Sequence, residues 1–187
     1  MTDYKFTNDW FKNSELRREL SSHLNLDSNN RMLEIGSYEG ASACFFSDYF
    51  LDHSESLLIC VDPFSQGDTT SPVALSTKDS FYSNISLSKN KSKVIVKEQY
   101  SHNFFEANYS LFNFIYIDGS HLLDDIAKDF INSLKVIKPG GIIWMDDYGG
   151  GSDGGVAMRA HIDALFRAHE EKLDLIHKGY QIAFRYK

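Results

Sequence analysis

The chain has 187 residues, which suits one folded domain, and its 42% apolar and 24% charged residues are ordinary for a globular protein. A formal net charge of −7 disfavours nucleic acid as the main partner, because a phosphate backbone attracts a basic surface. No apolar run approaches the roughly 20 residues of a membrane span. The polar start carries no secretory signal, and Cys44 and Cys60 fall inside predicted elements, so we expect reduced thiols, no membrane partner and a cytoplasmic location.

Apolar periodicity and turn residues predict alternating helices and strands along the whole chain. The predicted helices cover residues 8–24, 41–50, 78–87, 122–137 and 156–171. The predicted strands cover residues 31–35, 57–61, 94–96, 112–117, 142–145, 173–176 and 181–186, with a polar loop over 63–77 and a glycine-rich loop over 146–155. Strands joined by helices require right-handed crossovers. We therefore predict a doubly wound α/β fold with a mostly parallel seven-stranded sheet and one antiparallel strand in a C-terminal hairpin.

The loop after the first predicted strand reads Gly36-Ser-Tyr38-Glu39-Gly40. Glycine there tolerates a positive φ and lets a ligand approach the backbone. Tyr38 occupies the place of the middle glycine of a dinucleotide fingerprint, which argues against a pyrophosphate. Glu34 and Glu39 would repel phosphate and attract an ammonium or sulfonium group. The loop could also be only a tight turn.

The second predicted strand ends in Asp62-Pro63. An acidic side chain at this position is well placed to accept hydrogen bonds from both hydroxyls of a ribose. Together with the acidic glycine loop, it indicates a nucleoside ligand without phosphates. S-adenosylmethionine is the common cofactor of that description.

Acidic side chains also follow the fourth and fifth predicted strands, as Asp118 with His121, and as Asp146 with Asp147. If these strands lie side by side, the four side chains converge at the carboxyl edge of the sheet, where ligands bind in open α/β folds. Three carboxylates and an imidazole there indicate a site, with a divalent cation as one occupant. Alternatively, Asp118 caps the next helix, His121 is an ordinary residue of its first turn, and the aspartate pair is a solvated strand end.

These motifs occur in an order that resembles the class I S-adenosylmethionine-dependent methyltransferases over residues 30–187, including the lysine-proline-glycine turn at 138–141. The Asp-x-x-His and Asp-Asp-Tyr groups are similar to metal-dependent sugar O-methyltransferases that act on macrolide antibiotics. The resemblance implies a Rossmann-like methyltransferase fold in a single domain, residues 1–187. Its parts would be an N-terminal helical extension over 1–29 and a catalytic core over 30–187.

The resemblance also implies site residues. The cofactor S-adenosyl-L-methionine would be bound by Glu34, Gly36, Ser37, Tyr38, Gly40, Ser42, Asp62, Pro63, Tyr100, Ser101 and Asp118. Mg2+ would be bound by Asp118, Asp146 and Asp147, and the catalytic residues would be His121, as base, and Asp118. Tyr100 would stack on the adenine and Ser101 would hydrogen-bond its edge, although the same segment could be a simple loop.

We therefore expect a methyltransferase that methylates a hydroxyl of a small molecule such as a sugar. A cation on the hydroxyl would lower its pKa and orient it. The alternatives are a metal-independent methyltransferase, a nicotinamide-dependent oxidoreductase and an inactive cofactor-binding module. Methylation of nucleic-acid bases is disfavoured because Asp118 precedes Gly-Ser-His rather than a proline pair and an aromatic residue. The acceptor and the oligomeric state stay open, a homodimer included.

Overall fold

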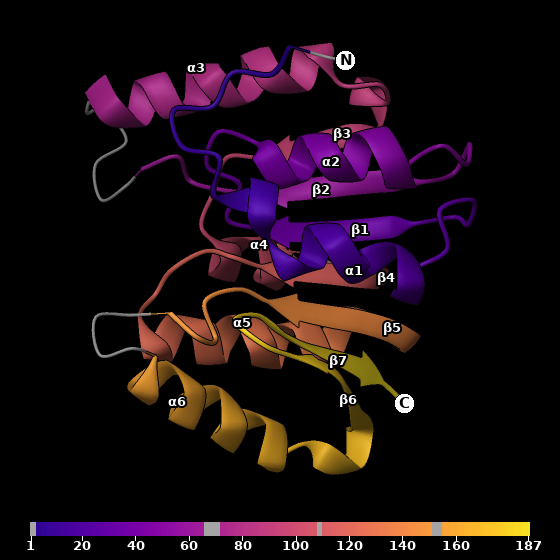
Figure 1. The fold of residues 1–187 in the computed structure, drawn as a ribbon, viewed down its shortest axis with the longest axis vertical. Helices are drawn as coiled ribbons and strands as arrows, with labels where there is room; N and C mark the ends of the chain where they lie inside the picture. The colour runs from indigo at the N-terminus through magenta and orange to yellow at the C-terminus, as the bar shows by residue number, and fades with distance from the viewer. Residues whose placement is uncertain (1–2, 66–71, 108–109, 151–154) are drawn as a thin grey trace.

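The computed structural model describes residues 3–65, 72–107, 110–150 and 155–187. Its sheet has the strand order β3-β2-β1-β4-β5-β7-β6. The first four pairings are parallel, and β7 is antiparallel to both of its neighbours. The predicted doubly wound sheet with one antiparallel strand is therefore confirmed (Figure 1). Within those described ranges, no helix is both long and apolar enough to cross a membrane.

The elements alternate along the chain as the sequence predicts. The strands are β1 (Arg31–Ile35), β2 (Leu57–Val61), β3 (Val94–Lys97), β4 (Phe112–Ile117), β5 (Ile137–Met145), β6 (Leu173–Lys178) and β7 (Ile182–Tyr186). The α-helices are α1 (Glu15–His23), α2 (Ala41–Phe50), α3 (Pro72–Leu87), α4 (Ser101–Ala107), α5 (Leu123–Val136) and α6 (Val156–Arg167). Short 3-10 helices cover η1 (Trp10–Asn13), η2 (Lys91–Lys93) and η3 (Glu170–Lys172).

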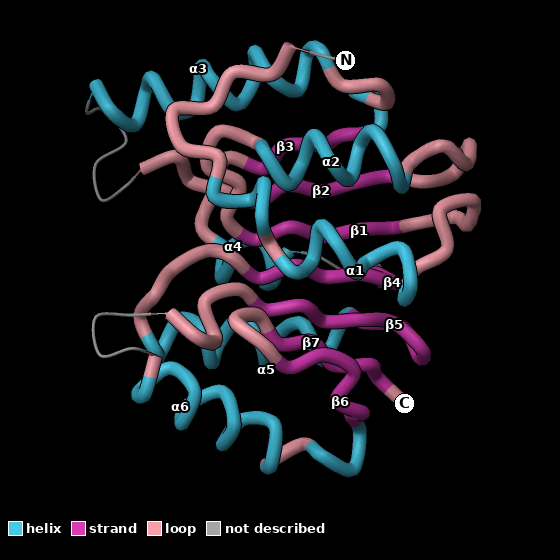
Figure 2. Tube along the Cα trace, viewed as in Figure 1, coloured by secondary structure: helices cyan, strands magenta, loops and turns pink. Residues whose placement is uncertain are grey.

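Two separate hydrophobic cores cover the two faces of the sheet. Figure 2 shows the helices arranged around the strands. Helices α1, α2 and α3 pack on one face, and α4, α5 and α6 pack on the other. Neighbouring residues of a strand point to opposite faces, so Met32 enters the first core and Leu33 the second. Burial on both faces explains why the central strands are almost continuously apolar.

The predicted single helix over residues 8–24 is wrong. The segment forms η1 and α1, which are separated at Ser14, where the backbone is extended with ψ 150°. The Ser14 hydroxyl accepts a hydrogen bond from the Arg17 amide at 3.1 Å. Serine at this position caps a new helix rather than continuing the old one.

Other boundaries also differ from the prediction. Helix α3 begins at Pro72 instead of residue 78, and residues 66–71 of the predicted loop lie outside the described residues, as do residues 151–154. Helix α4 was not predicted, because its seven residues bury only Phe104 and carry no periodic signal. Helix α6 ends at Arg167, before η3. Strand β5 begins at Ile137 because the chain pairs with Phe112 immediately after α5 and then shifts register.

Candidate active site

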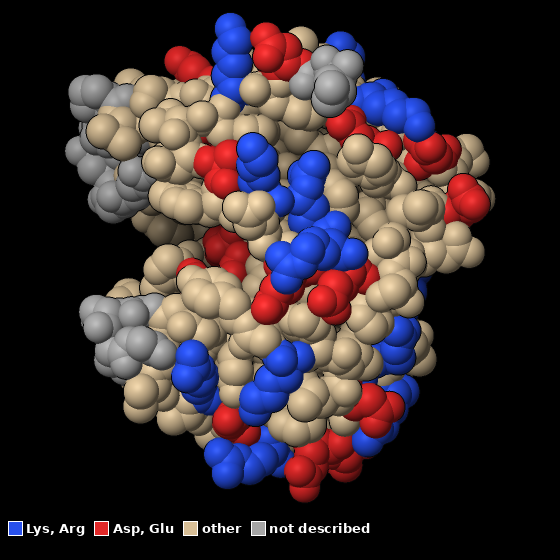
Figure 3. All heavy atoms as spheres, viewed as in Figure 1, with Lys and Arg blue, Asp and Glu red and all other residues tan. Residues whose placement is uncertain are grey.

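A cleft of about 1380 Å³ opens at the carboxyl ends of the parallel strands. Figure 3 shows one side of the molecule hollowed, with acidic side chains visible inside the recess. The volume exceeds the roughly 300–1,000 Å³ of most small-molecule sites, so a cofactor and an acceptor both fit. The predicted site residues that line the cleft are Gly36, Ser37, Tyr38, Ser42, Asp62, Pro63, Tyr100, Ser101, Asp118, His121, Asp146 and Asp147.

Glycine is required at two positions of the loop between β1 and α2. Gly36 has φ +83°, and a Cβ added there would overlap the carbonyl oxygen of Asp118. Gly40 has φ +84° and starts α2, where a Cβ would lie 3.0 Å from the ring of Phe81. The missing side chain at Gly36 therefore allows the loop to pack against the backbone that follows β4.

Asp62 holds the glycine loop in place. One oxygen of its carboxylate accepts hydrogen bonds from the backbone amides of Ser37, at 2.7 Å, and Tyr38, at 3.0 Å. The other oxygen accepts from the amide of Phe64 at 2.6 Å. A carboxylate offers about four acceptor positions, so one remains for a ligand in the cleft. Asp62 therefore fixes the loop and also faces the site.

Glu34 and Glu39 do not present free carboxylates to the cleft. Glu34 is 0% exposed and accepts hydrogen bonds from the hydroxyls of Ser37 and Ser42. Burial raises the pKa of Glu34 to about 7, which weakens its negative charge at neutral pH. Glu39 accepts from the amide and the hydroxyl of Thr7, at 2.6 and 2.8 Å. Both carboxylates are therefore bonded within the protein, and the predicted attraction of Glu34 and Glu39 for a cationic ligand is weakened.

The fourth and fifth strands bring Asp118 and Asp146 together above Tyr116. The Tyr116 hydroxyl donates to Asp146 at 2.5 Å and lies 3.0 Å from Asp118. Asp146 also accepts the amide of Asp147 at 2.7 Å, so both of its oxygens have partners in the protein. Burial and the neighbouring carboxylates raise the pKa of Asp118 well above its usual range. Ionisation of these crowded carboxyls is therefore unfavourable, and a bound cation would favour their charged forms.

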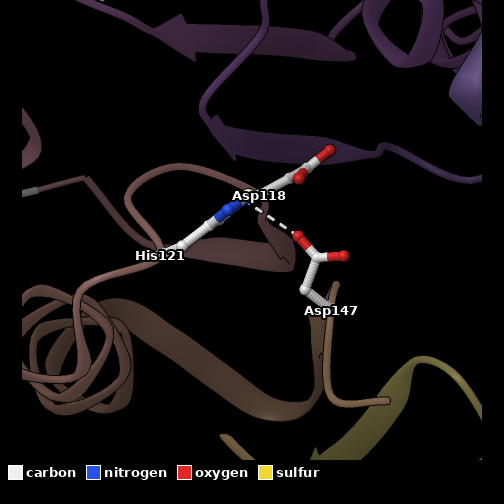
Figure 4. A group of neighbouring side chains, drawn as sticks. All are labelled: Asp118, His121 and Asp147. Atoms are coloured by element: carbon white, nitrogen blue, oxygen red, sulfur yellow. Dashed lines mark ion pairs between the residues drawn. The ribbon is translucent and has the colours of Figure 1, made fainter. Parts of the chain in front are cut away.

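His121 and Asp147 form an ion pair at the mouth of this acidic group. His121 Nε2 lies 2.9 Å from Asp147 Oδ2, and Figure 4 shows the two side chains pointing toward each other. The hydrogen bond to Asp147 raises the pKa of His121, whose side chain is 69% exposed. The same bond lowers the pKa of Asp147. Asp147 therefore orients the imidazole and favours its protonated form.

Within the part of the chain that the structure describes, one group of side chains could hold a metal ion. It consists of Asp118, His121 and Asp147, whose ligand atoms lie within 4.8 Å of one another. Asp146, which the sequence suggested as a third ligand, lies beside this group but is engaged by Tyr116 and a backbone amide. Mg2+ is often held by one or two carboxylates and completes its octahedron with water or substrate oxygens. Two aspartates in an open cleft fit that chemistry.

Tyr100 and Ser101 also line the cleft. Tyr100 stacks on His102, with ring centroids 5.7 Å apart, and its hydroxyl lies 3.4 Å from that of Ser65. Ser101 begins α4 and hydrogen-bonds to Asp129, whose pKa is raised to about 6 by burial. Ser101 is therefore the first residue of α4, Tyr100 lies in the loop before it, and both line the cleft.

Three cleft or site residues were missed by sequence reasoning. Trp10 pairs with Tyr38 at 5.2 Å between ring centroids, Tyr116 bridges two aspartates, and Tyr180 donates to Asp147 at 2.6 Å. The sequence could have indicated Tyr116. Residues two positions apart on a strand point to the same face, and Asp118 lies two positions after Tyr116. Trp10 and Tyr180 carried no such indication, since both reach the cleft only through tertiary packing.

Comparisons with known proteins identify the kind of domain that carries this cleft. A family model described as a methyltransferase domain matches residues 33–148, a span that holds the glycine loop and both acidic strand ends. No sequence among curated proteins matches the chain.

Solved structures share the fold at low sequence identity. An O-methyltransferase from Bacillus cereus, in complex with SAH, is 20% identical, with a TM-score of 0.64 over 84% of this chain and 74% of that one. The O-methyltransferase TomG from Streptomyces achromogenes, involved in tomaymycin synthesis and in complex with SAM, is 17% identical, with a TM-score of 0.65 over 91% and 77%. A Clostridium thermocellum protein, described provisionally as an rRNA-methylase, is 9% identical, with a TM-score of 0.67 over 91% and 92%. These likenesses establish the fold and leave the acceptor to be argued from the site.

Proposed function

Because this chain belongs to the methyltransferase domain family and is a class I S-adenosylmethionine-dependent methyltransferase, we propose that it methylates a hydroxyl oxygen of a small molecule with the help of Mg2+. One observation carries this proposal. A single cleft contains the glycine loop braced by Asp62 and, on the neighbouring strands, the group of Asp118, His121 and Asp147. The first part suits the cofactor, and the second suits the activation of a hydroxyl.

The proposed cofactor site is the loop between β1 and α2 together with the ends of β2 and β3. Close packing at Gly36 would let the cofactor lie against the loop backbone, and the remaining acceptor position of Asp62 would take a ribose hydroxyl. Tyr100 and Ser101, which also line the cleft, would contact the adenine. Glu34, which is buried, would not contact the cofactor itself but would orient the hydroxyls of Ser37 and Ser42.

Asp62→Asn is expected to weaken the binding of S-adenosylhomocysteine by about 10-fold or more, which corresponds to roughly 1.4 kcal/mol. The asparagine NH2 group cannot accept a hydrogen bond, so at least one loop amide loses its partner. Titration calorimetry measures the loss directly. Asp52→Asn is the matched control, because Asp52 bonds Lys89 and Asn90 on the surface and does not line the cleft. Equal affinities for the two variants would contradict this role of Asp62.

The proposed chemistry begins with an acceptor hydroxyl, which is a poor nucleophile because it is almost wholly protonated at neutral pH. A cation held by Asp118 and Asp147 would supply the lowered hydroxyl pKa and a fixed orientation. His121 would take the proton on Nδ1 while Nε2 stays bonded to Asp147. Asp147 orients the imidazole and stabilises its charged form, and the exposed side chain releases the proton to solvent.

The titration of His121 is expected to depend on Asp147. Since the carboxylate favours the imidazolium form, the pKa of His121 lies above the ordinary value of about 6.5. A base must be neutral to act, so activity should rise with pH through this raised pKa. Asp147→Asn should lower the pKa of His121, because the asparagine side chain carries no charge to favour the imidazolium form. The NMR titration of the His121 ring protons measures this shift, and an unchanged midpoint would exclude the pair as the active base.

A metal-independent version of the same reaction is the second candidate. Two observations favour it. Asp146 is already bonded to Tyr116, which leaves two carboxylates and a histidine in the group. His121 and Asp147 already form a pair in which the carboxylate would orient the base. The two candidates predict the same product and differ in their response to chelation.

The test is the transfer of labelled methyl from S-adenosylmethionine to a panel of hydroxylated small molecules, with added Mg2+ or with EDTA. Incorporation that EDTA abolishes supports the metal-assisted reaction, and incorporation that EDTA leaves intact supports the second candidate. Binding of S-adenosylhomocysteine without transfer to any acceptor would indicate an inactive module. Binding of NAD in place of the nucleoside would overturn the proposal.

A further inference from the structure

The turn between β6 and β7, residues 179–181, is held between the N-terminal helix α1 and the loop that follows β5. On one side, the Tyr180 hydroxyl donates to Asp147 Oδ1 at 2.6 Å. The Tyr180 carbonyl also accepts the amide of Gly149 at 2.8 Å. The turn therefore contacts the acidic loop through both its side chain and its backbone.

Asp147 requires such support. Its φ is +52°, a left-handed conformation that costs free energy for any residue with a side chain. Its two carboxylate oxygens are divided between His121 and Tyr180. A Cβ added at Gly150 would lie 2.9 Å from both Asp147 Oδ1 and the Tyr180 hydroxyl, so the missing side chain there keeps room for this hydrogen bond.

On its other side, the turn is bound to the first turn of α1. Glu15 accepts the amide of Tyr180 at 3.1 Å and the amide of Gln181 at 2.8 Å. The Gln181 side chain, which is 1% exposed, accepts the amide of Leu16 at 2.7 Å and the indole N–H of Trp144 at 3.1 Å. The contacts with Glu15 and Leu16 join residues about 165 positions apart in the sequence, so they tie the turn to α1.

The imidazole of His177 also contacts α1. Its Nε2 lies 2.9 Å from Glu15 and its Nδ1 lies 3.2 Å from Glu19, so both ring nitrogens face α1. The ring stacks on Trp144, with centroids 5.0 Å apart and planes 19° apart. Glu15 is therefore bound by His177 of β6 as well as by the amides of the turn.

We propose that Tyr180 is a positioning residue for Asp147 and that α1, through Glu15, sets the position of Tyr180. This inference rests on the proposed function, since it assigns a role relative to the cation that Asp147 would help to hold. The N-terminal extension, which contains α1, would then help to position a residue of the active site. Groups that orient the ligands of a metal typically contribute 10- to 100-fold to its affinity.

The experiment is the binding of Mn2+, as a paramagnetic substitute for Mg2+, to the full-length protein, followed by electron paramagnetic resonance. Tyr180→Phe keeps the ring and removes only the hydroxyl, and we expect Mn2+ affinity to fall about 10- to 100-fold. Tyr82→Phe is the matched control, because the Tyr82 hydroxyl also donates to a carboxylate, that of Glu98, at 2.6 Å, and neither residue lines the cleft. Glu15→Gln, which weakens the acceptor of two turn amides, should give a smaller loss in the same direction.

Asp118→Asn is the reference that separates failure of this inference from failure of the proposed function. If Asp118→Asn weakens Mn2+ binding while Tyr180→Phe matches Tyr82→Phe, the role of Tyr180 is refuted and the metal site stands. If Asp118→Asn also leaves Mn2+ binding unchanged, the metal site is refuted and the inference with it. Thermal unfolding and S-adenosylhomocysteine affinity should be the same for the two tyrosine variants, and a loss of either in Tyr180→Phe alone would indicate a merely structural role.

Discussion

Asp118→Asn is expected to lower methyl transfer by about 100-fold or more while leaving the protein folded. A bound cation stabilises the developing charge by several kcal/mol, and about 2.7 kcal/mol corresponds to 100-fold in rate. Asparagine keeps the size of the side chain and removes the charge that would hold the cation. Initial rates over a range of Mg2+ concentrations measure the effect, and excess Mg2+ should restore part of the activity.

The same substitution should not destabilise the protein in the absence of metal. Because burial and the neighbouring aspartates raise the pKa of Asp118 in the folded state, ionisation of this carboxyl opposes folding. That cost is absent below the unfolded pKa of about 3.9 and grows as the pH rises toward the folded value. In EDTA, Asp118→Asn should therefore unfold at the same or a higher temperature than the wild type near pH 7, with the difference vanishing in acid. A variant that is fully active, or less stable at neutral pH, would contradict the account.

Gly36→Ala is expected to destabilise the protein by at least about 3 kcal/mol. A left-handed φ costs a residue with a side chain roughly 1–2 kcal/mol, and overlap with a packed neighbour costs typically 1–3 kcal/mol more. Here the neighbour is the backbone carbonyl of Asp118, which cannot rotate away as a side chain could. Urea unfolding measures the loss, and binding of S-adenosylhomocysteine should fall with it.

Gly140→Ala separates the two contributions. Gly140 has a similar φ of +78°, but an added Cβ would meet no atom within 4 Å. This variant should therefore lose only the roughly 1–2 kcal/mol of backbone strain. The difference between the two variants isolates the contact between the glycine loop and the Asp118 backbone. If both lose the same free energy, that contact does not constrain the site.

Much of the fold could be predicted because local patterns decide it. The buried strands are apolar on both faces, and each ends in a glycine, an aspartate or a turn, so β1, β2 and β4 were placed within a residue of their observed bounds. The site followed from topology, since parallel neighbours must bring Asp118 and Asp147 to one edge. That part of the prediction needed no knowledge of side-chain contacts.

The remaining features depend on contacts between distant residues, which a single sequence does not reveal. Glu34 and Glu39 read as free acidic groups because their partners, the Ser37 and Ser42 hydroxyls and Thr7, become neighbours only in the folded loop. Asp146 and Asp147 are adjacent in the sequence, yet among the described residues Asp147 is the one that groups with Asp118 and His121, while Asp146 accepts from the Tyr116 hydroxyl. Tyr180 reaches the site from the turn between β6 and β7, whose backbone amides donate to Glu15 of α1.

The central claim is that one cleft holds the cofactor beside a cation bound by Asp118 and Asp147. Its most direct test is a crystal structure with S-adenosylhomocysteine and Mn2+, in which anomalous diffraction locates the ion. We predict the nucleoside on the glycine loop, with its ribose at Asp62, and an anomalous peak within coordination distance of both aspartates. An occupied nucleoside site with no peak at these aspartates, or a peak bound elsewhere in the cleft, would contradict the account.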